Sequence, residues 1–305
     1  MKTRNAHRRC VRAAQPNIEF LPESGHFFNF DFAVRRMDDQ DATPPHTHSF
    51  DEVVIITGGS GVHVIDNQEY PLIRGDAFVI RGQHVHLFRN VEGLRLVNLL
   101  IKRARFSALE QECRDLPGFH ALFVLEPHAR QSHRFQAKLH LAPNQLNHLM
   151  HLVELLDNEL KTNQSGAAHV VEALVKIIIV TICRYYSTTD SGDCNALVRV
   201  SKVIRHLEDH YADAHSLAAL ARLAGMSSRS FRRAFKTATG CSPGAYLLRL
   251  RIERAAQLLA LPDANVTNAA LDVGFDNSSY FAQQFRKVMN MTPRAYIARQ
   301  RALQP

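Results

Sequence analysis

Cationic side chains able to bind a polyanion recur at helical spacing in the last third of the chain. They fall at positions i, i+3, i+4 and i+7 of one predicted helix, as Arg229, Arg232, Arg233 and Lys236. Like charges on adjacent helical turns repel by about 0.2–0.5 kcal/mol per pair, and nothing in the stability of the fold requires four cations there. A polyanion would offset it, since arginine binds guanine O6 and N7 with two hydrogen bonds and lysine neutralises phosphate.

A second stripe with the same spacing lies 50 residues further on and carries fewer charges. Its members are Ser279, Ala282, Gln283 and Arg286. Glutamine pairs with adenine through two hydrogen bonds, and an alanine methyl contacts the thymine methyl, so this stripe also suits the major groove of DNA. Because the two stripes differ in chemistry, we expect them to prefer different half-sites.

The elements that must position the stripes form an internal repeat with an offset of 49 or 50 residues, one residue being inserted in the second turn. The matched positions are Phe231, Phe235, Pro243 and Tyr246 with Phe281, Phe285, Pro293 and Tyr296. Each copy reads as a helix, a glycine-containing turn and a second helix, which opens at the N-cap candidate Ser227 or Asp276. This pattern predicts a helix-turn-helix, present twice, whose second helix enters the major groove.

The spacing and the charge of this region agree with that prediction. The predicted connecting helix Pro243–Ala260 would span roughly 27 Å at about 1.5 Å per residue. That length suits the placement of the two second helices in successive major grooves, which lie about 34 Å apart. Residues 195–305 hold 16 Lys and Arg against 7 Asp and Glu, whereas residues 1–194 hold 21 against 22. The excess positive charge therefore lies in the last third, which favours a polyanionic partner for that part alone.

Residues 266–300 resemble the signature of the AraC/XylS family of transcription regulators. The resemblance lies in Gly274-Phe275 after an alanine, in a Ser-Tyr-Phe at 279–281 and in Thr292-Pro293 followed by Tyr296, and the first copy matches as well. Two positions depart mildly from the signature: Ala269 replaces a bulkier aliphatic residue, and Asn290 stands where glycine is common. The resemblance implies sequence-specific binding to double-stranded promoter DNA, as an activator that contacts RNA polymerase, with no catalytic residue.

Residues 44–61 (PPHTHSFDEVVIITGGSG) resemble the first cupin motif, whose positions fall on His46, His48, Glu52 and Gly59. The segment from Gly75 to His86 resembles the second motif, with Arg81 where proline is frequent. The resemblance implies a β-barrel, and alternation along its strands would point the three histidines and the glutamate into one effector-binding pocket. Phe88, on the same strand face as His86, would stack on a sugar ring.

Several alternatives remain open for this pocket. Imidazole and carboxyl groups hydrogen-bond to the hydroxyls of a polyol, which favours a sugar as the effector without a cofactor or a metal. The same four residues suit a divalent metal, and a metal-dependent cupin enzyme with a nucleic-acid-binding tail is the rival hypothesis. They are otherwise buried, hydrogen-bonded barrel residues. A constitutive architectural DNA binder is a further alternative for the whole chain, and His63 and His84 have no assigned role.

The length of 305 residues favours two domains. The polar stretch 187–196 (STTDSGDCNA) predicts a linker between an effector-binding and dimerisation domain (1–186) and a DNA-binding domain (197–305). In the first domain, short β-rich runs alternate with the turn signals GGSG, DNQ, RGD and VEG. Two amphipathic segments, Pro143–Lys161 and Ala167–Tyr186, predict a helical hairpin. The hairpin resembles the family's dimerisation element, which implies a homodimer; its apolar residues would equally serve to cover the barrel.

The remaining features bear on location and effector class. No two of the five cysteines form a CxxC pair, and the most apolar stretch, Ala173–Cys183, is too short to cross a bilayer. We therefore expect a cytoplasmic protein that binds no membrane. Leu116–Pro127 resembles a segment of rhamnose- or melibiose-type regulators. The predicted fold class is α+β in two domains, a cupin-like β-barrel with a helical hairpin followed by an all-α double helix-turn-helix. The predicted function is sequence-specific activation of transcription in response to a small molecule, with a sugar favoured.

Overall fold

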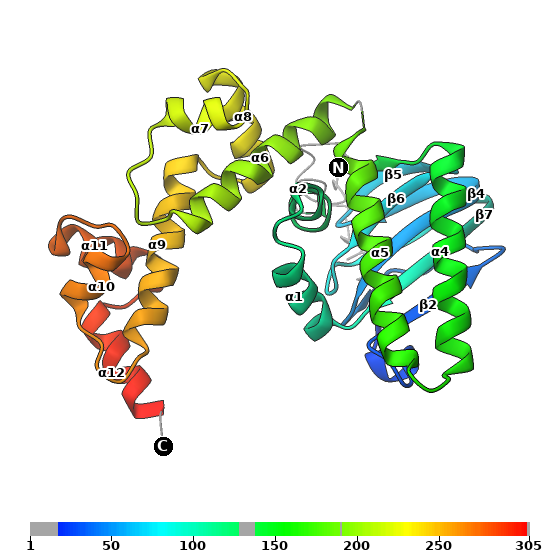
Figure 1. The fold of residues 1–305 in the computed structure, drawn as a ribbon, viewed down its shortest axis with the longest axis horizontal. Helices are drawn as coiled ribbons and strands as arrows, with labels where there is room; N and C mark the ends of the chain where they lie inside the picture. The colour runs from blue at the N-terminus through cyan, green and yellow to red at the C-terminus, as the bar shows by residue number, and fades with distance from the viewer. Residues whose placement is uncertain (1–17, 128–137, 190, 304–305) are drawn as a thin grey trace, which may run out of the picture.

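The computed structural model describes residues 18–127, 138–189 and 191–303. The chain forms a sheet-rich part followed by an all-helical part, and the helix α6 (Gly192–Asp209) runs between them (Figure 1). This arrangement confirms the predicted α+β class with two domains.

The described strands of the sheet-rich part are β1 (Glu19–Leu21), β2 (Phe32–Met37), β3 (His46–His48), β4 (Asp51–Ile65), β5 (Gln68–Ile73), β6 (Asp76–Ile80), β7 (His86–Ile101) and β8 (Leu139–His140). The strands pair antiparallel except for β1 with β3. The long strands β4 and β7 pair along most of their length. Since β6 pairs with the first half of β4 and β5 with the second half, β4 passes from one wall of the fold to the other.

The turns predicted at GGSG (58–61) and VEG (91–93) are wrong. Both segments lie within the continuous strands β4 and β7, and the pairing register shifts three times between Ile56 and Val62. Gly59 has φ of +67°, and a Cβ there would lie 2.0 Å from the backbone oxygen of Gly93. Glycine therefore bends a bulged strand here instead of ending it.

Alternation along β4 divides the core of this part. Val54 and Ile56 lie inside the barrel with Phe78 and Phe88, whereas Val53 and Ile55 belong to the cluster beneath the helices. The helices α4 (Pro143–Thr162) and α5 (Ala167–Ser187) lie side by side on the sheet (Figure 1). They match the predicted hairpin. Short helical segments complete the part: η1 (Glu23–Gly25), α1 (Arg103–Glu112), α2 (Pro117–Phe119) and the π-helical η2 (His120–Leu125).

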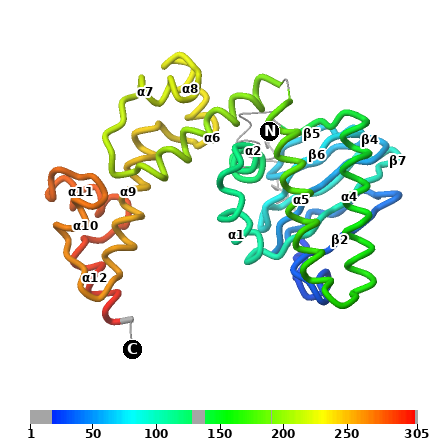
Figure 2. The backbone as a smooth tube through the Cα atoms, in the orientation of Figure 1, coloured from blue at the N-terminus to red at the C-terminus, as the bar shows by residue number. Residues whose placement is uncertain are grey.

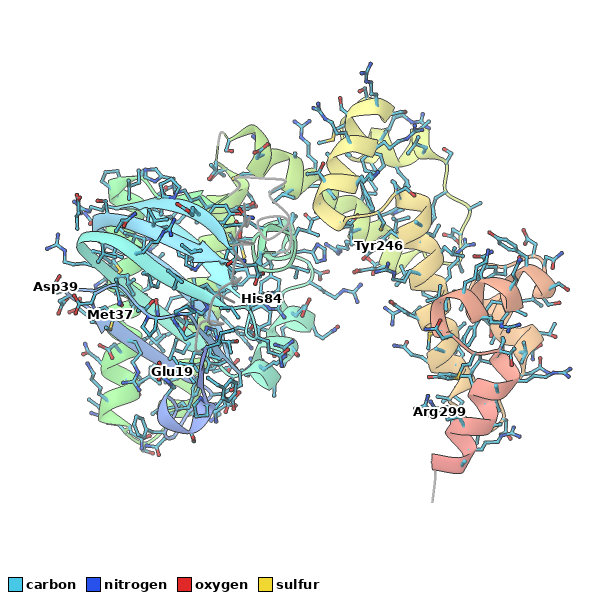
Figure 3. The ribbon with its side chains drawn as sticks, turned by 180° about the vertical axis from the view of Figure 1, so that it is seen from behind. Glu19, Met37, Asp39, His84, Tyr246 and Arg299 are labelled. Atoms are coloured by element: carbon cyan, nitrogen blue, oxygen red, sulfur yellow. The ribbon has the colours of Figure 1, made fainter. Side chains whose placement is uncertain are left out.

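The predicted linker 187–196 is largely replaced by helix. Helix α5 ends at Ser187 and α6 begins at Gly192, while residue 190 lies outside the described residues. Cys194 is fully buried, so the first turn of α6 packs although its sequence is polar. Helix α6 also contacts α2 and η2. His84 from the barrel and Tyr246 from the helical part are among the residues that line one groove at this seam, and Figure 3 labels both. The division into domains at 1–186 and 197–305 stays a prediction.

The helical part repeats its packing as well as its sequence. Its further helices are α7 (Leu217–Leu223), α8 (Ser228–Thr239), α9 (Pro243–Leu259), α10 (Val266–Asp272), α11 (Ser278–Met289) and α12 (Pro293–Leu303). In the first copy the rings of Phe231 and Phe235 lie 5.5 Å apart, and Phe235 lies 5.6 Å from Tyr246. In the second copy the corresponding two separations are both 5.6 Å. Asn290 adopts φ of +57°, a left-handed conformation that asparagine tolerates.

Gly59→Ala is expected to lower the free energy of unfolding of the sheet-rich part by about 2–4 kcal/mol, because the new Cβ adds a backbone clash to an unfavourable φ. Denaturant unfolding of the full chain measures the change. The matched control is Gly93→Ala, where φ is +54° but an added Cβ has nothing within 4 Å. Its loss should be about 1 kcal/mol. Equal losses in the two variants would contradict the close backbone contact.

Candidate functional site

Helix α8 exposes the whole predicted cationic stripe. Arg229, Arg232, Arg233 and Lys236 are exposed to solvent. The opposite face is buried, and its members are Phe231, Ala234, Phe235 and Ala238. Because the buried face fixes how the helix sits, the cations share the surface that the helix turns outward.

Helix α11 presents the second stripe in the same way. Ser279, Gln283 and Arg286 are exposed, and Ala282 is half-buried. Phe281, Gln284 and Phe285 form the buried face. The helix α9 contacts α8, α10 and α11, so it joins the two helix-turn-helix units (Figure 2). The structure therefore offers two outward polar helix faces on a shared support, as the DNA-binding prediction needs.

Side-chain caps fix the start of both second helices. Ser227 Oγ accepts a hydrogen bond from the Ser230 amide at 3.2 Å, which agrees with the predicted N-cap. In the second copy Asn277, not the predicted Asp276, is the cap, and its Oδ1 accepts from the Tyr280 amide at 2.9 Å. The inserted residue precedes the cap, so the cap follows the offset of 50 that relates the second helices.

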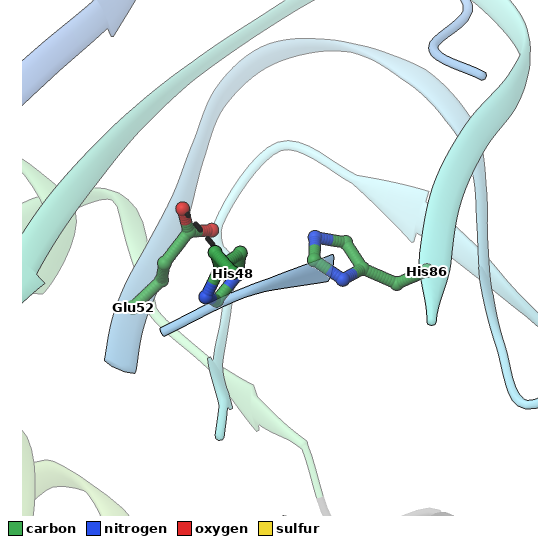
Figure 4. Close-up of side chains that lie close together, drawn as sticks. All are labelled: His48, Glu52 and His86. Carbon is green, nitrogen blue, oxygen red and sulfur yellow. Dashed lines mark ion pairs between the residues drawn. The ribbon is translucent and has the colours of Figure 1, made fainter. Parts of the chain in front are cut away.

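The polar cluster of the barrel assembles from three strands. His48 on β3, Glu52 on β4 and His86 on β7 are buried, and one ligand atom from each lies within 4.8 Å of the others (Figure 4). His48 Nε2 is 3.7 Å from Glu52 Oε1. His46 on β3 is half-buried and opposite His86 in the strand register, with their rings 4.2 Å apart. The structure thus brings together the four polar residues that the motif predicts.

Backbone carbonyls orient the histidine rings. The Nδ1 atom lies 2.6 Å from the Phe50 carbonyl in His48, 3.1 Å from the His84 carbonyl in His86, and 3.0 Å from the Pro44 carbonyl in His46. A carbonyl only accepts, so Nδ1 carries the proton in each ring. In its neutral form, each ring then has its lone pair at Nε2.

Burial keeps the central pair uncharged near neutral pH. It lowers the pKa of His48 to about 4, because the imidazolium would lose its hydration. Burial, reinforced by the negative charge of Asp51, raises the pKa of Glu52 to about 8. The contact in Figure 4 is therefore one between a neutral imidazole and a carboxylic acid, whose O–H group is a hydrogen-bond donor.

The interior also contains a histidine that the sequence analysis left unassigned. His63 is fully buried, with its ring 5.7 Å from His86 and 5.2 Å from Phe88. Phe88 does lie on the face of His86, but it packs into the apolar barrel cluster as well as against His63. Simple alternation places His63 on the wrong face relative to Glu52. The bulges at Gly58 to Val62 shift the alternation, and a sequence-level sign is the glycine cluster between them.

The cluster also suits a divalent transition metal. Metal-binding histidines ordinarily donate the other ring N–H to a carbonyl or carboxylate, as His48 and His86 do here, and a glutamate completes a common ligand set. His48 Nε2 is a buried atom without a hydrogen-bond partner among the described residues, which agrees with a ligand position. Such an ion would supply Lewis-acid binding of an oxygen ligand.

Two domain families match this chain. Residues 30–174 match the AraC-like ligand binding domain, and residues 220–299 match a helix-turn-helix domain. In the described ranges, no helix is long and apolar enough to cross a membrane.

Whole-chain relatives match over both domains. The chain is 30% identical to an HTH-type transcriptional activator RhaS of Escherichia fergusonii over 84% of this chain and 87% of that protein. It is 28% identical to RhaS of Escherichia coli O1:K1, over 91% of this chain and 94% of that one. A solved AraC-type regulator from Chromobacterium violaceum covers 35% of this chain and 94% of its own, with 30% identity and a TM-score of 0.33.

Asn277→Ala is expected to lower the free energy of unfolding of the DNA-binding domain by about 1 kcal/mol, since the first turn of α11 loses its cap. Asp276→Ala, one residue earlier and without a capping bond in the structure, should have less than half that effect. Denaturant unfolding without DNA compares the two. A larger loss for Asp276→Ala would contradict the cap assignment.

Proposed function

This chain belongs to the AraC/XylS family of transcription regulators, and on that premise we propose that it binds paired promoter half-sites through α8 and α11 and changes that binding when a sugar occupies the barrel. The family makes it a DNA-binding transcriptional activator that responds to a small molecule, and not an enzyme. One observation carries the proposed contacts: both second helices bury an aromatic face and expose a polar one.

The two helices are proposed to read different bases. Arg229, Arg232, Arg233 and Lys236 supply guanine and phosphate contacts from α8. Ser279, Ala282, Gln283 and Arg286 supply a less charged surface from α11, with glutamine suited to adenine. The local positive charge also attracts DNA without regard to sequence, and that contribution weakens with salt.

Arg233→Ala is expected to reduce affinity for the preferred DNA site by about 1–3 kcal/mol and to relax base preference at one position, as removal of a base contact does. Lys236→Ala should weaken binding more evenly across sequences and lower the salt slope by about one. Quantitative footprinting at several salt concentrations measures both effects.

Arg74→Ala is the control, since Arg74 is an exposed arginine in the turn between β5 and β6, away from both stripes and from α4 and α5. Unchanged affinity in both Arg233→Ala and Lys236→Ala would reject the assignment of this stripe to DNA.

The chemistry of the barrel supports an uncharged, hydroxyl-bearing effector. At neutral pH the pKa values of His48 and Glu52 leave an acceptor nitrogen and a donor O–H side by side. His46 and His86 add further ring nitrogens, and Phe88 adds an aromatic surface. A sugar hydroxyl both donates and accepts, so this set suits it. The resemblance of residues 116–127 to sugar-responsive regulators points the same way.

Effector binding changes DNA occupancy only if the effector prefers one conformation. A ligand with equal affinity for two arrangements shifts no population, so the sugar must bind more tightly to one arrangement of the protein than to another. We also propose that the protein acts in the cytoplasm, contacts RNA polymerase, and forms a homodimer through α4 and α5. Those helices leave Leu155, Val170 and Ile177 between 43% and 48% exposed, which supports a partner on that surface.

His48→Ala is expected to abolish the effect of the active sugar on DNA affinity while leaving affinity without sugar within about twofold, because the change lies in the barrel. Fluorescence anisotropy with labelled promoter DNA and a panel of monosaccharides and disaccharides measures both quantities. Arg74→Ala, an exposed change in the turn between β5 and β6, should keep the sugar response.

Elemental analysis of the same preparations addresses the metal. If the unmodified protein contains stoichiometric Fe, Mn or Zn and His48→Ala does not, the sugar binds through a metal ion and not through direct hydrogen bonds to the side chains. A sugar response that survives His48→Ala in a metal-free protein would contradict the proposed effector site.

A further inference from the structure

Arg251 on the connecting helix α9 makes an unusual set of backbone contacts. Its Nε donates to the Tyr211 carbonyl at 2.7 Å and its Nη1 to the Gly274 carbonyl at 2.7 Å. Its Nη2 donates to the carbonyls of Ala212 at 3.2 Å and Asp213 at 2.8 Å. One half-buried guanidinium thus contacts two separate segments, the loop after α6 and the turn of the second helix-turn-helix.

The two segments are pressed together at this point. Gly274 has φ of +82°, and a Cβ there would lie 2.2 Å from the Ala212 carbonyl oxygen. Phe275, next in the turn, has its ring 5.8 Å from the Arg251 guanidinium carbon. Hydrogen bonds at one residue therefore close a backbone junction between α6, α9 and the second unit.

Only an arginine provides this junction. The guanidinium presents five donors in a planar fork, whereas a lysine offers one nitrogen and an amide two donors. Burial lowers the pKa of Arg251, and the negative charges of Asp276 and Asp213 oppose that shift. The guanidinium therefore loses part of its hydration, and hydrogen bonds to backbone carbonyls replace it. The four hydrogen bonds to two separate segments indicate a positioning role, because they fix the turn of the second unit against the loop after α6.

The junction leads back to the effector domain through α6. Ser201 Oγ on α6 donates to the Pro117 carbonyl at 3.0 Å, and Arg205 Nη2 is 2.7 Å from Asp115 Oδ1. Helix α6 also packs on α8 and α7 of the first unit. The loop that Arg251 holds is the continuation of the same helix, so one rigid element touches the effector domain, the first unit and, through Arg251, the second.

We propose that Arg251 is the positioning residue that fixes the orientation of the second helix-turn-helix relative to α6 and the first unit, and thereby the spacing of half-sites that the protein accepts. This inference rests on the proposed binding to paired half-sites. It adds a spacing determinant that lies outside the two recognition stripes. Its physical basis is effective concentration: linking two binding modules raises affinity only where the geometry lets both engage together.

The experiment uses the full chain and DNA sites selected from a random pool. Each variant is titrated against the complete site, against each half-site alone, and against the complete site with one base pair inserted between the halves. Arg251→Gln is expected to bind the complete site at least about tenfold more weakly than the unmodified protein, since the joint engagement is lost. It should keep its affinity for each isolated half-site within about twofold and lose the discrimination against the inserted base pair.

Two further variants separate geometry from charge. Arg251→Lys keeps the charge but not the fork, so it should resemble Arg251→Gln in spacing discrimination. Arg249→Gln removes an exposed arginine from the same helix and should keep that discrimination whatever it does to overall affinity.

The outcomes are distinguishable. Loss of binding to the isolated second half-site in Arg251→Gln would show that the unit has unfolded and would overturn a positioning role, as would unchanged spacing discrimination in that variant. If the unmodified protein enriches no bipartite DNA, the proposed function itself fails, independently of Arg251.

Discussion

Each second helix of the DNA-binding domain is held in place by three aromatic rings. Phe231 and Phe235 pack with Tyr246 in the first unit, and Phe281 and Phe285 pack with Tyr296 in the second, at nearly the same separations. Burying large rings on one face is the main stabilisation available to a helix of three turns, because such a helix is marginal alone. The remaining face must then lie in solvent. The position of the cations and amides is thus a consequence of aromatic burial, and the proposed DNA contacts depend on it.

In the effector domain the main physical constraint is different, because polar side chains are buried inside an apolar barrel. Neutral forms of His48 and Glu52 reduce the penalty of burial, and carbonyl contacts to Nδ1 keep the rings oriented. A hydroxyl-bearing ligand or a metal ion would bind the Nε2 atoms and the Glu52 carboxyl group. Both readings use the same side chains, and they differ in what binds between them.

Repeating patterns were predictable from the sequence, and irregular ones were not. The stripes of α8 and α11 follow from helical periodicity, and the connecting helix differs from its prediction only at Ala260. The turn predicted at GGSG fails because glycine permits a bulge as readily as a turn, and tertiary pairing decides between them. The same bulge shifts the alternation of β4, so that His63 enters the barrel interior although strict alternation predicts the opposite face. Helix α6 begins inside the predicted linker because burial of Cys194 overrides a polar local sequence, and the cap moves to Asn277 because one inserted residue changes the offset.

Selection of duplex DNA from a random pool by the full chain of 305 residues tests the central claim most directly. Two outward recognition helices on one support predict enrichment of a bipartite site, with two unlike motifs about one helical turn apart. Enrichment of a single uninterrupted motif, or of none, would contradict the account.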